Sequence, residues 1–470
     1  MSKKEENEID DRRKNPQILT LLIMFVITSV FIGVVYFVYQ NLMIDSSISH
    51  SKNQMPYASI IKKADNITIA AHYPRFSNET INDDLATLVN EYVDAFTANN
   101  SDEEDKIFYL DYNLFQVKDQ FASIVILLAV GSDVDDLVLS PIAFLNYDLN
   151  SGKKITLDDI FVSGYEKKLA AHLRRNIKDN NENLSSDFYH NTKAIKENFK
   201  TFTIDNDRLD IYYESSLVLD EDKGLITISF NLNQLAFLLS APINSDPIVT
   251  PCDRDEMYLR YIDPDLPMVA LTYDDGPYAP TTEKILDYLL ENNSAATFFL
   301  VGNRIYPYAD TLKRMLKQGN EIGNHSYTHK YSMTKLSKEE LRKDLKKTQD
   351  DLNEYVGDYT IRFMRPTYGN YNQYVKDNAG YAMVNWSIDT LDWQSRDSRK
   401  IYDIVIRNVK DGDIILMHDL YQSTVEASER IIPELISKGY QLVTLSELFE
   451  YKKILPEVGK VYYSTYQDPR

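Results

Sequence analysis

The segment MVALTYDDGP (268–277) ends an apolar run with two adjacent aspartates, Asp274 and Asp275. Such a run is typical of a buried strand, and the Gly-Pro pair after it stops the strand in a turn. Two carboxylates at one strand end repel each other, which favours a cation between them. Farther along, His325 and His329 stand four positions apart, and neutral imidazoles are common metal ligands. The pattern therefore predicts a metal-dependent hydrolase, in which one aspartate and both histidines bind the metal while the other aspartate moves protons.

From Pro267 onward, buried strands alternate with amphipathic helices. Strict alternation predicts an α/β fold with a parallel sheet, and about seven repeats over roughly 200 residues predict a distorted (β/α) barrel. The expected strands are 268–275, 295–303, 320–326, 360–366, 381–389, 413–419 and 440–445. In such barrels the chemistry lies where strands end and loops begin. The polar candidates all lie at such ends: Asp274, Asp275, His325, Arg365, Asp389, Asp392 and His418.

The first half of the chain is the acidic half. The net charge is −20, of which residues 253–470 carry −6 and residues 1–252 carry −14. This balance argues against a nucleic-acid partner, because phosphate binding needs a basic face. Cys252 is the single cysteine, so no intrachain disulfide can form.

An apolar segment near the start predicts a membrane anchor. Residues 18–39 are almost entirely apolar, and at 1.5 Å per residue they span a hydrocarbon core of roughly 30 Å. Arg12, Arg13 and Lys14 precede them, so the positive-inside rule puts residues 1–16 in the cytoplasm and the chain after the anchor (17–40) outside the cell membrane. A cleaved signal peptide is the rival reading, but the stretch is long for an h-region and no A-x-A-like site follows it.

Composition and periodicity divide the rest of the chain into four segments. They are a tether (41–56), an α+β stem domain (57–152), a second α+β stem domain with a proline-rich linker (153–252), and the catalytic domain (253–470). The first stem domain is expected to place a helix at 83–98 among its strands. In the second, Leu169, Leu173 and Ile177 mark one buried helix face, and His172 is expected to be solvated.

Five motifs of the last domain resemble those of a known family, in that family's order. They are LTYDDGP (271–277), GNHSYTH (323–329), RPTYG (365–369), SIDTLDW (387–393) and ILMHD (415–419). With them the chain resembles polysaccharide deacetylases of the carbohydrate esterase family 4 type, which carry a NodB homology domain. Two departures are slight, since Tyr273 stands where phenylalanine is usual and Thr367 where proline is usual.

The resemblance implies how the metal and the base are arranged. It implies Asp275, His325 and His329 as metal ligands and Asp274 as the base. Arg365 would orient Asp274, which a bidentate pair could do. Zinc is the first expectation for the divalent metal, with cobalt or manganese as alternatives.

The resemblance also implies the acid and the substrate contacts. His418 would be the acid, supported by Asp392. The backbone N–H of Tyr368 would stabilise the oxyanion. Trp393 and Leu416 would line an apolar pocket for the acetyl methyl group.

The expected substrate follows from location as well as from resemblance. The family acts on chitin, on acetylated xylan and on peptidoglycan, and a domain outside a Gram-positive membrane faces peptidoglycan. The layout is similar to streptococcal-type membrane-anchored N-acetylglucosamine deacetylases. The expected reaction therefore converts N-acetylglucosamine of the wall into glucosamine and acetate, which would confer lysozyme resistance. The alternatives are an O-acetyl polysaccharide esterase, an N-acetylmuramic acid or chitin-type deacetylase, and a non-enzymatic wall-binding or signalling receptor.

Overall fold

The structure is a computed structural model that describes residues 56–64, 66–99, 105–117, 120–205, 208–232 and 259–466, together with residues 235 and 239. Two compact units are distinguished, with the main boundary between Thr156 and Leu157, and the first unit also includes Thr203–Asp207. No helix among the described residues is long and apolar enough to cross a bilayer. The expected tail (1–16) and anchor (17–40) lie outside those residues, and so does nearly all of the tether. The domain boundaries expected from sequence remain predictions.

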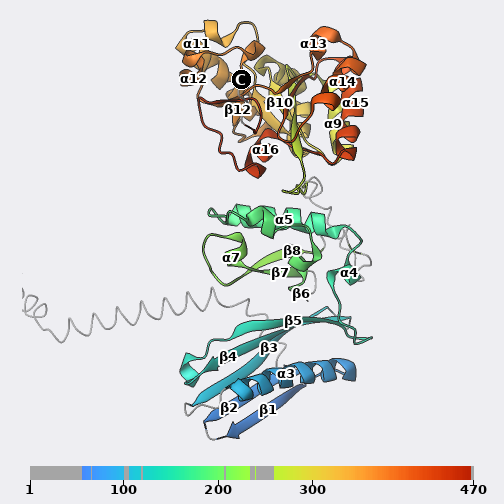
Figure 1. Ribbon diagram of the computed structural model, residues 1–470, viewed down its shortest axis with the longest axis vertical. Helices are drawn as coiled ribbons and strands as arrows, with labels where there is room; N and C mark the ends of the chain where they lie inside the picture. Colours follow the sequence, from blue (N-terminus) through green and yellow to red (C-terminus); the bar gives the residue numbers. More distant parts are fainter. Residues whose placement is uncertain are drawn as a thin grey trace, which may run out of the picture. The chain divides into compact units, whose positions relative to one another are not determined.

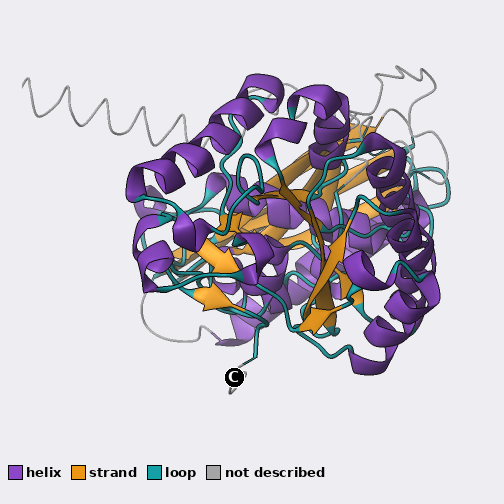
Figure 2. Ribbon diagram, turned by 90° about the horizontal axis from the view of Figure 1, so that it is seen from above, coloured by secondary structure: helices purple, strands orange, loops and turns teal. Residues whose placement is uncertain are grey.

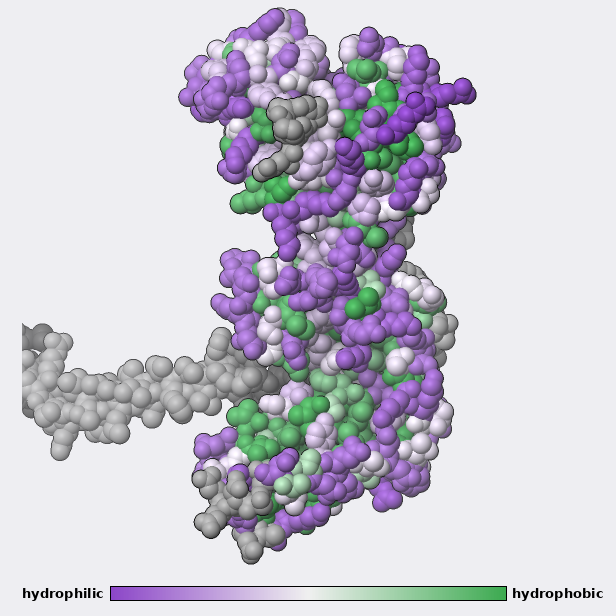
Figure 3. All heavy atoms as spheres, viewed as in Figure 1, coloured by the Kyte–Doolittle hydropathy of each residue, from purple (hydrophilic) through white to green (hydrophobic). Residues whose placement is uncertain are grey.

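The first unit is a five-stranded sheet with one helix packed on it (Figure 1). Its elements are β1 (Tyr57–Ala64), β2 (Ile67–Pro74), α3 (Glu79–Asn99), β3 (Lys106–Val117), β4 (Phe121–Gly131) and β5 (Ser140–Asp148). The strands follow the order β1-β2-β3-β4-β5, and only β2 and β3, which α3 connects, are parallel. Ile81, Leu85, Val89 and Val93 recur every four residues on α3 and are fully buried, so one stripe of the helix covers the sheet. Apolar side chains are also visible on the surface of this unit, over β4 and β5 (Figure 3).

The second unit begins with a small α+β region. Its elements are α4 (Leu157–Ile160), α5 (Tyr165–Asn180), α6 (Phe188–Asn191), β7 (Arg208–Glu214), α7 (Ser215–Val218) and β8 (Leu225–Asn231). The strand β6 (Phe202–Asp205) begins in this region, but its residues from Thr203 onward belong to the first unit. Leu169, Leu173 and Ile177 of α5 are buried as expected. The expectation for His172 was wrong, because this side chain is also buried, with the Phe230 ring of β8 only 6.4 Å away. Burial lowers the pKa of His172 to about 4.

The catalytic domain is built on a curled sheet whose paired strands are all parallel (Figure 1). Its strands are β9 (Met268–Asp274), β10 (Thr297–Leu300), β11 (Glu321–Asn324), β12 (Phe363–Met364), β13 (Ala382–Val384), β14 (Ile388–Asp389), β15 (Ile414–His418), β16 (Gln441–Leu442) and β17 (Val461–Tyr462). They follow the order β14-β15-β9-β10-β11-β12-β13-β17, with β16 beside β9. The sheet is therefore a curled parallel half-barrel.

The sheet does not close into a barrel at residues 381–389, where two short strands, β13 and β14, replace the single expected strand. Residues 381–389 were expected to be continuous, but the chain leaves the sheet between β13 and β14. The Asn385 N–H donates to Tyr462 O beside β13, whereas the Ser387 N–H donates to Ile414 O of β15. The segment thus connects β13, near one edge of the sheet, with β14 at the other edge. These two strands are joined by the chain and are not hydrogen-bonded to each other.

Helices surround the strands of this domain (Figure 2). They are α9 (Ala279–Glu291), α10 (Ala309–Lys317), α11 (Lys338–Val356), α12 (Gln373–Asn378), α13 (Asp392–Ser395), α14 (Ser398–Asn408), α15 (Gln422–Ser437) and α16 (Leu445–Tyr451). Alternate residues of β9, Val269, Leu271 and Tyr273, pack in the core under these helices. Because side chains alternate along a strand, Thr272 and Asp274 lie on the opposite face, toward the interior of the half-barrel.

Candidate active site

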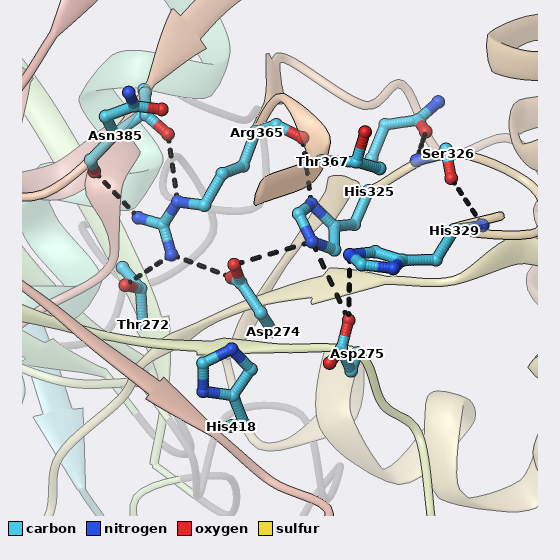
Figure 4. A network of polar contacts seen from close by, with 12 residues as sticks. Thr272, Asp274, Asp275, His325, Ser326, His329, Arg365, Thr367, Asn385 and His418 are labelled. Atoms are coloured by element: carbon cyan, nitrogen blue, oxygen red, sulfur yellow. Dashed lines mark hydrogen bonds and ion pairs between the residues drawn. The ribbon is translucent and has the colours of Figure 1, made fainter. Parts of the chain in front are cut away.

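Three predicted metal ligands converge where β9 and β11 end. Asp275 follows β9, and His325 follows β11 and begins the loop that also carries His329. One carboxylate oxygen and one ring nitrogen from each histidine lie within 4.8 Å of one another. The distance from Asp275 Oδ1 is 3.5 Å to His329 Nε2 and 3.7 Å to His325 Nε2. In Figure 4 both histidines point toward Asp275.

These donor atoms fit a divalent metal. Two atoms that each bind one zinc at about 2.1 Å in tetrahedral geometry lie ~3.4 Å apart, close to the distances found here. Asp275 Oδ1 is buried and accepts no hydrogen bond from any described residue, so it is free for a cation. Burial lowers the pKa of His325 to about 3, which keeps its imidazole neutral, as a ligand must be.

Neighbouring groups hold the ring of His325 and the backbone of His329. His325 Nδ1 lies 2.8 Å from Arg365 O, so its Nε2 faces the metal position. The backbone N–H of His329 donates to Ser326 Oγ, and the Tyr368 hydroxyl donates to His329 O. The contact to Nδ1 sets the tautomer and direction of the His325 ring, whereas the contacts of His329 hold the backbone that carries its ring.

The predicted base, Asp274, lies beside this site and is held by Arg365. Both side chains are buried, and Arg365 Nη1 donates to Asp274 Oδ1 at 2.7 Å. The expected bidentate pair was wrong in this detail, because the other guanidinium donors go to Val384 O, Asn385 O and Thr272 Oγ1 (Figure 4). Burial raises the pKa of Asp274, and the charge of Arg365 opposes that rise.

The predicted acid, His418, lies across from the base and is paired with Asp392. His418 of β15 is in register with Asp274 of β9, which places the two at the same level. We call the carboxyl-terminal end of the sheet, where these strands end, the mouth of the half-barrel. His418 Nδ1 lies 2.8 Å from Asp392 Oδ1, and Thr424 donates to the other oxygen of Asp392. Burial alone would lower the pKa of His418, but the hydrogen bond to Asp392 and its charge raise it to about 9. This shift favours the protonated form of His418, which an acid requires.

The three predicted substrate-contacting residues surround the same mouth. Tyr368 lies in a 3-10 helix, η8 (Thr367–Gly369), and the first N–H groups of such a turn have no partner within it. Trp393 is half exposed in α13, and Leu416 is buried on β15 in register with Thr272 and Asp389. Their roles toward an acetyl group stay predictions.

The backbone at this mouth adopts conformations that side chains disfavour. Five non-glycine residues here have left-handed φ values between 50° and 77°: Asp275, Ser326, His329, Tyr368 and Leu391. Each such residue costs roughly 1–2 kcal/mol relative to a right-handed conformation. Strain of this kind clusters where function requires an exact side-chain position.

Several buried residues near the site have no role expected from the sequence. Thr272 and Thr424 bind Arg365 and Asp392 through hydroxyls, and no sequence signal distinguishes them from core threonines. Asp389 is partly buried on β14, where it accepts from the Leu391 N–H. Asp419 is fully buried directly after His418. Its place within ILMHD (415–419) was the available signal.

Several known proteins are similar to this chain. The family model described as polysaccharide deacetylase matches residues 262–384. Peptidoglycan-N-acetylmuramic acid deacetylase PdaC of Bacillus subtilis (strain 168) is 31% identical over 417 residues, covering 84% of this chain and 88% of that protein. Peptidoglycan-N-acetylglucosamine deacetylase PgdA of Listeria monocytogenes is 36% identical over 195 residues, covering 42% of this chain and 41% of that protein.

A solved structure of peptidoglycan deacetylase PdaC from Bacillus subtilis is 42% identical, with a TM-score of 0.40, over 41% of this chain and 94% of that chain. The sequence similarity to PdaC extends over most of both proteins, and the family match covers the part of the half-barrel from β9 to β13. The chain belongs to the polysaccharide deacetylase family.

Proposed function

We propose that this protein is a metal-dependent deacetylase that removes the N-acetyl group from amino sugars of cell-wall peptidoglycan. One observation carries the proposal. Three groups that could hold a metal ion, Asp275, His325 and His329, lie next to the buried carboxyl of Asp274 and the imidazole of His418, whose pKa is raised by its pairing with Asp392. Amide hydrolysis needs a metal that polarises the carbonyl, a base for the attacking water and an acid for the leaving nitrogen, all in one site.

The residues of the chain divide the reaction between them. A divalent metal, for which zinc is our first candidate, would polarise the amide carbonyl and make water more acidic. Asp274, oriented by Arg365, takes the proton of the attacking water. His418 gives its proton to the nitrogen as the C–N bond breaks, because an amine anion is a very poor leaving group. The products are acetate and a free amino sugar.

The developing oxyanion requires a donor aimed at its position. The Tyr368 N–H is the candidate, since its backbone is held in a left-handed conformation beside His329. Trp393 and Leu416 would contact the acetyl methyl from the β14 and β15 side.

Two sugars are candidates for the substrate. N-Acetylglucosamine is expected from the sequence and is named for PgdA, which matches the catalytic domain. N-Acetylmuramic acid is named for PdaC, whose similarity extends beyond the catalytic domain into the stem. Because that alignment covers 84% of the chain, it favours muramic acid more than motifs alone do.

The membrane anchor completes the proposal. We place residues 1–16 in the cytoplasm, residues 17–40 in the membrane and the catalytic domain outside, facing the wall. The support is the apolar stretch and the basic residues before it. Loss of N-acetyl groups would then leave the wall a poorer substrate for lysozyme.

The test uses the purified full-length chain with Zn²⁺ and isolated peptidoglycan. Muramidase fragments are analysed by tandem mass spectrometry, which assigns each lost acetyl group to glucosamine or to muramic acid. Parallel reactions contain chitooligosaccharides and acetylated xylan. Acetate from none of them would refute the proposal, and acetate from xylan alone would make the protein an O-acetyl esterase.

A further inference from the structure

Asp419 is a buried carboxyl that the reaction above does not use. It follows His418 at the end of β15 and is fully buried. Thr282 Oγ1 donates to its Oδ2, and Thr281 Oγ1 donates to its backbone oxygen, both at 2.5 Å. Its Oδ1 is buried and has no hydrogen-bond partner among the described residues. A buried carboxyl oxygen without a donor costs stability, so the position calls for an explanation.

The carboxyl group of Asp419 lies against Gly276, the residue after the metal ligand Asp275. A side chain on Gly276 would overlap with that carboxyl group. Gly276 is not among the residues with a left-handed φ, so the glycine is needed here for close approach. On its other side the turn is bonded to β10, since Asp275 N donates to Phe299 O and Val301 N donates to Gly276 O. The turn that carries Asp275 is therefore held between β10 and Asp419.

The same contacts reach the start of α9. Thr282 Oγ1, which donates to Asp419, accepts from the Tyr278 N–H. Asp419 thus touches the chain on both sides of Pro277, at Gly276 and through Thr282. Its backbone is continuous with His418, so one residue connects the strand end bearing the acid with the turn bearing the ligand.

We propose that Asp419 is a positioning residue, which fixes Asp275 in the metal site and sets its place relative to His418. It acts through Gly276 and Thr282 and contacts neither metal nor substrate. The inference rests on the proposed metal-dependent deacetylation. Metal affinity is nevertheless measured without substrate, so the two can fail separately.

Glu321 offers a matched control in the same domain. It too is a buried carboxyl that accepts from threonine and serine hydroxyls, Thr297 and Ser446, but it lies at the opposite end of the sheet. Removing either carboxyl leaves a similar hole and similar unpaired hydroxyls. Only Asp419 borders the ligand turn.

The experiment compares Asp419→Ala, Asp419→Asn, Thr282→Val and Glu321→Ala in the full-length protein. Zn²⁺ affinity is measured by competition with a chromophoric chelator, and Tm is measured on the metal-free forms. We expect Asp419→Ala to weaken Zn²⁺ binding about 10–100-fold, as loss of other supports of metal ligands does. Asp419→Asn, which keeps the shape and the acceptor for Thr282, should restore most of the affinity. Glu321→Ala should lower Tm and leave Zn²⁺ affinity unchanged.

Two results would overturn the proposal. One is wild-type Zn²⁺ affinity in Asp419→Ala, and the other is an equal loss of affinity in Glu321→Ala. Should Asp419→Ala not fold, Thr282→Val decides, because it removes a single hydroxyl at nearly constant shape. A weaker loss of affinity there supports the proposal, and an unchanged affinity refutes it. Zn²⁺ binding without acetate release in the wild type would refute the proposed function alone.

Discussion

At the amino-terminal end of the catalytic sheet, Glu321 is buried, and Thr297, Ser446 Oγ and the Ser446 N–H donate to its oxygens. At the carboxyl-terminal end, Asp275 and Asp419 each keep a buried oxygen that no described residue satisfies. The backbone differs in the same way. Left-handed residues before the strands are mostly glycines, such as Gly319, Gly412 and Gly439, with Asn293 before β10 as an exception. At the mouth only Gly369 is a left-handed glycine among the described residues, and the five left-handed residues named above carry side chains.

The difference shows what each end of the sheet does. The amino-terminal end follows the rules for stable structure more closely, because the oxygens of Glu321 are satisfied and glycine fills most left-handed turns, although Gln318 Oε1 is buried without a partner among the described residues. The mouth departs from both rules within a few residues of the predicted site. Departures of this kind are expected where a sequence specifies a function at some expense of stability.

Replacing a carboxylate at either end should give the largest contrast. Asp275→Asn is expected to lower deacetylation about 10⁴-fold or more, because the metal supplies several kcal/mol of transition-state stabilisation. Glu321→Gln should retain most of the activity while lowering Tm. Acetate release and zinc content of the two variants check this, and equal activity in both would contradict it.

Two ion pairs, one at each end, should differ in their contribution to stability. Arg365→Leu leaves Asp274 as an unpaired buried charge, and we expect a loss of about 3–5 kcal/mol in the free energy of unfolding. Arg260→Leu breaks the pair with Glu447, whose side chain is 27% exposed, and should cost less. Both tryptophans of the chain lie in the catalytic domain, so urea unfolding followed by their fluorescence reports on this domain. An equal loss of unfolding free energy in Arg365→Leu and Arg260→Leu would contradict the expected difference between the two ends of the sheet.

The pH dependence should reveal the His418–Asp392 pair. The acid must be protonated, so kcat/KM should fall as pH rises through about 9. In Asp392→Asn the charge that raises the pKa of His418 is gone. We therefore expect the fall of kcat/KM, the alkaline limb of the pH profile, to move below about pH 6.5, the usual pKa of histidine. His418→Ala should abolish the limb and lower kcat about 10²–10⁴-fold with zinc still bound. A limb that stays near 9 in Asp392→Asn would show that another group is the acid.

The same pair has a consequence for folding. The folded-state pKa of His418 is raised, so its contribution to stability is complete below about pH 6.5 and is lost as pH rises through about 9. Unfolding by urea should therefore show a larger difference in stability between wild type and His418→Ala at pH 6 than at pH 10.

The smallest expected effect concerns backbone strain. Leu391→Gly relieves a left-handed leucine at the mouth and should leave stability unchanged or raise it by up to about 1 kcal/mol. Gly439→Ala imposes a side chain on a left-handed glycine that has open space around it, so only strain opposes it, at about 1–2 kcal/mol. Tm values that change in the same direction would contradict the assignment of strain to the mouth.

The convergence of the site residues at the mouth could be predicted because it depends only on where each strand ends in the sequence. Polar residues that follow parallel strands must meet at one edge, and Asp274, Asp275, His325, Arg365 and His418 do so. The His418–Asp392 pair could be expected for the same reason, since both follow neighbouring strands. These expectations needed only strand boundaries and motif order.

The remaining features depend on tertiary packing. Whether Arg365 makes one contact or two to Asp274 depends on the carbonyls of Val384 and Asn385, which compete for its donors. The split between β13 and β14, the burial of His172 and the contact of Asp419 with Gly276 likewise arise between distant segments. No spacing or periodicity in the sequence predicts these three features.

The central claim is that the metal ligands and the proton-transfer pair form a single hydrolytic site. The most direct test strips the full-length protein with a chelator and returns Zn²⁺ stepwise while acetate release from peptidoglycan is recorded. We predict no release without metal, full recovery at a single zinc per chain, and no recovery in Asp275→Asn. Undiminished release from the stripped protein, or equal recovery in Asp275→Asn, would contradict the claim.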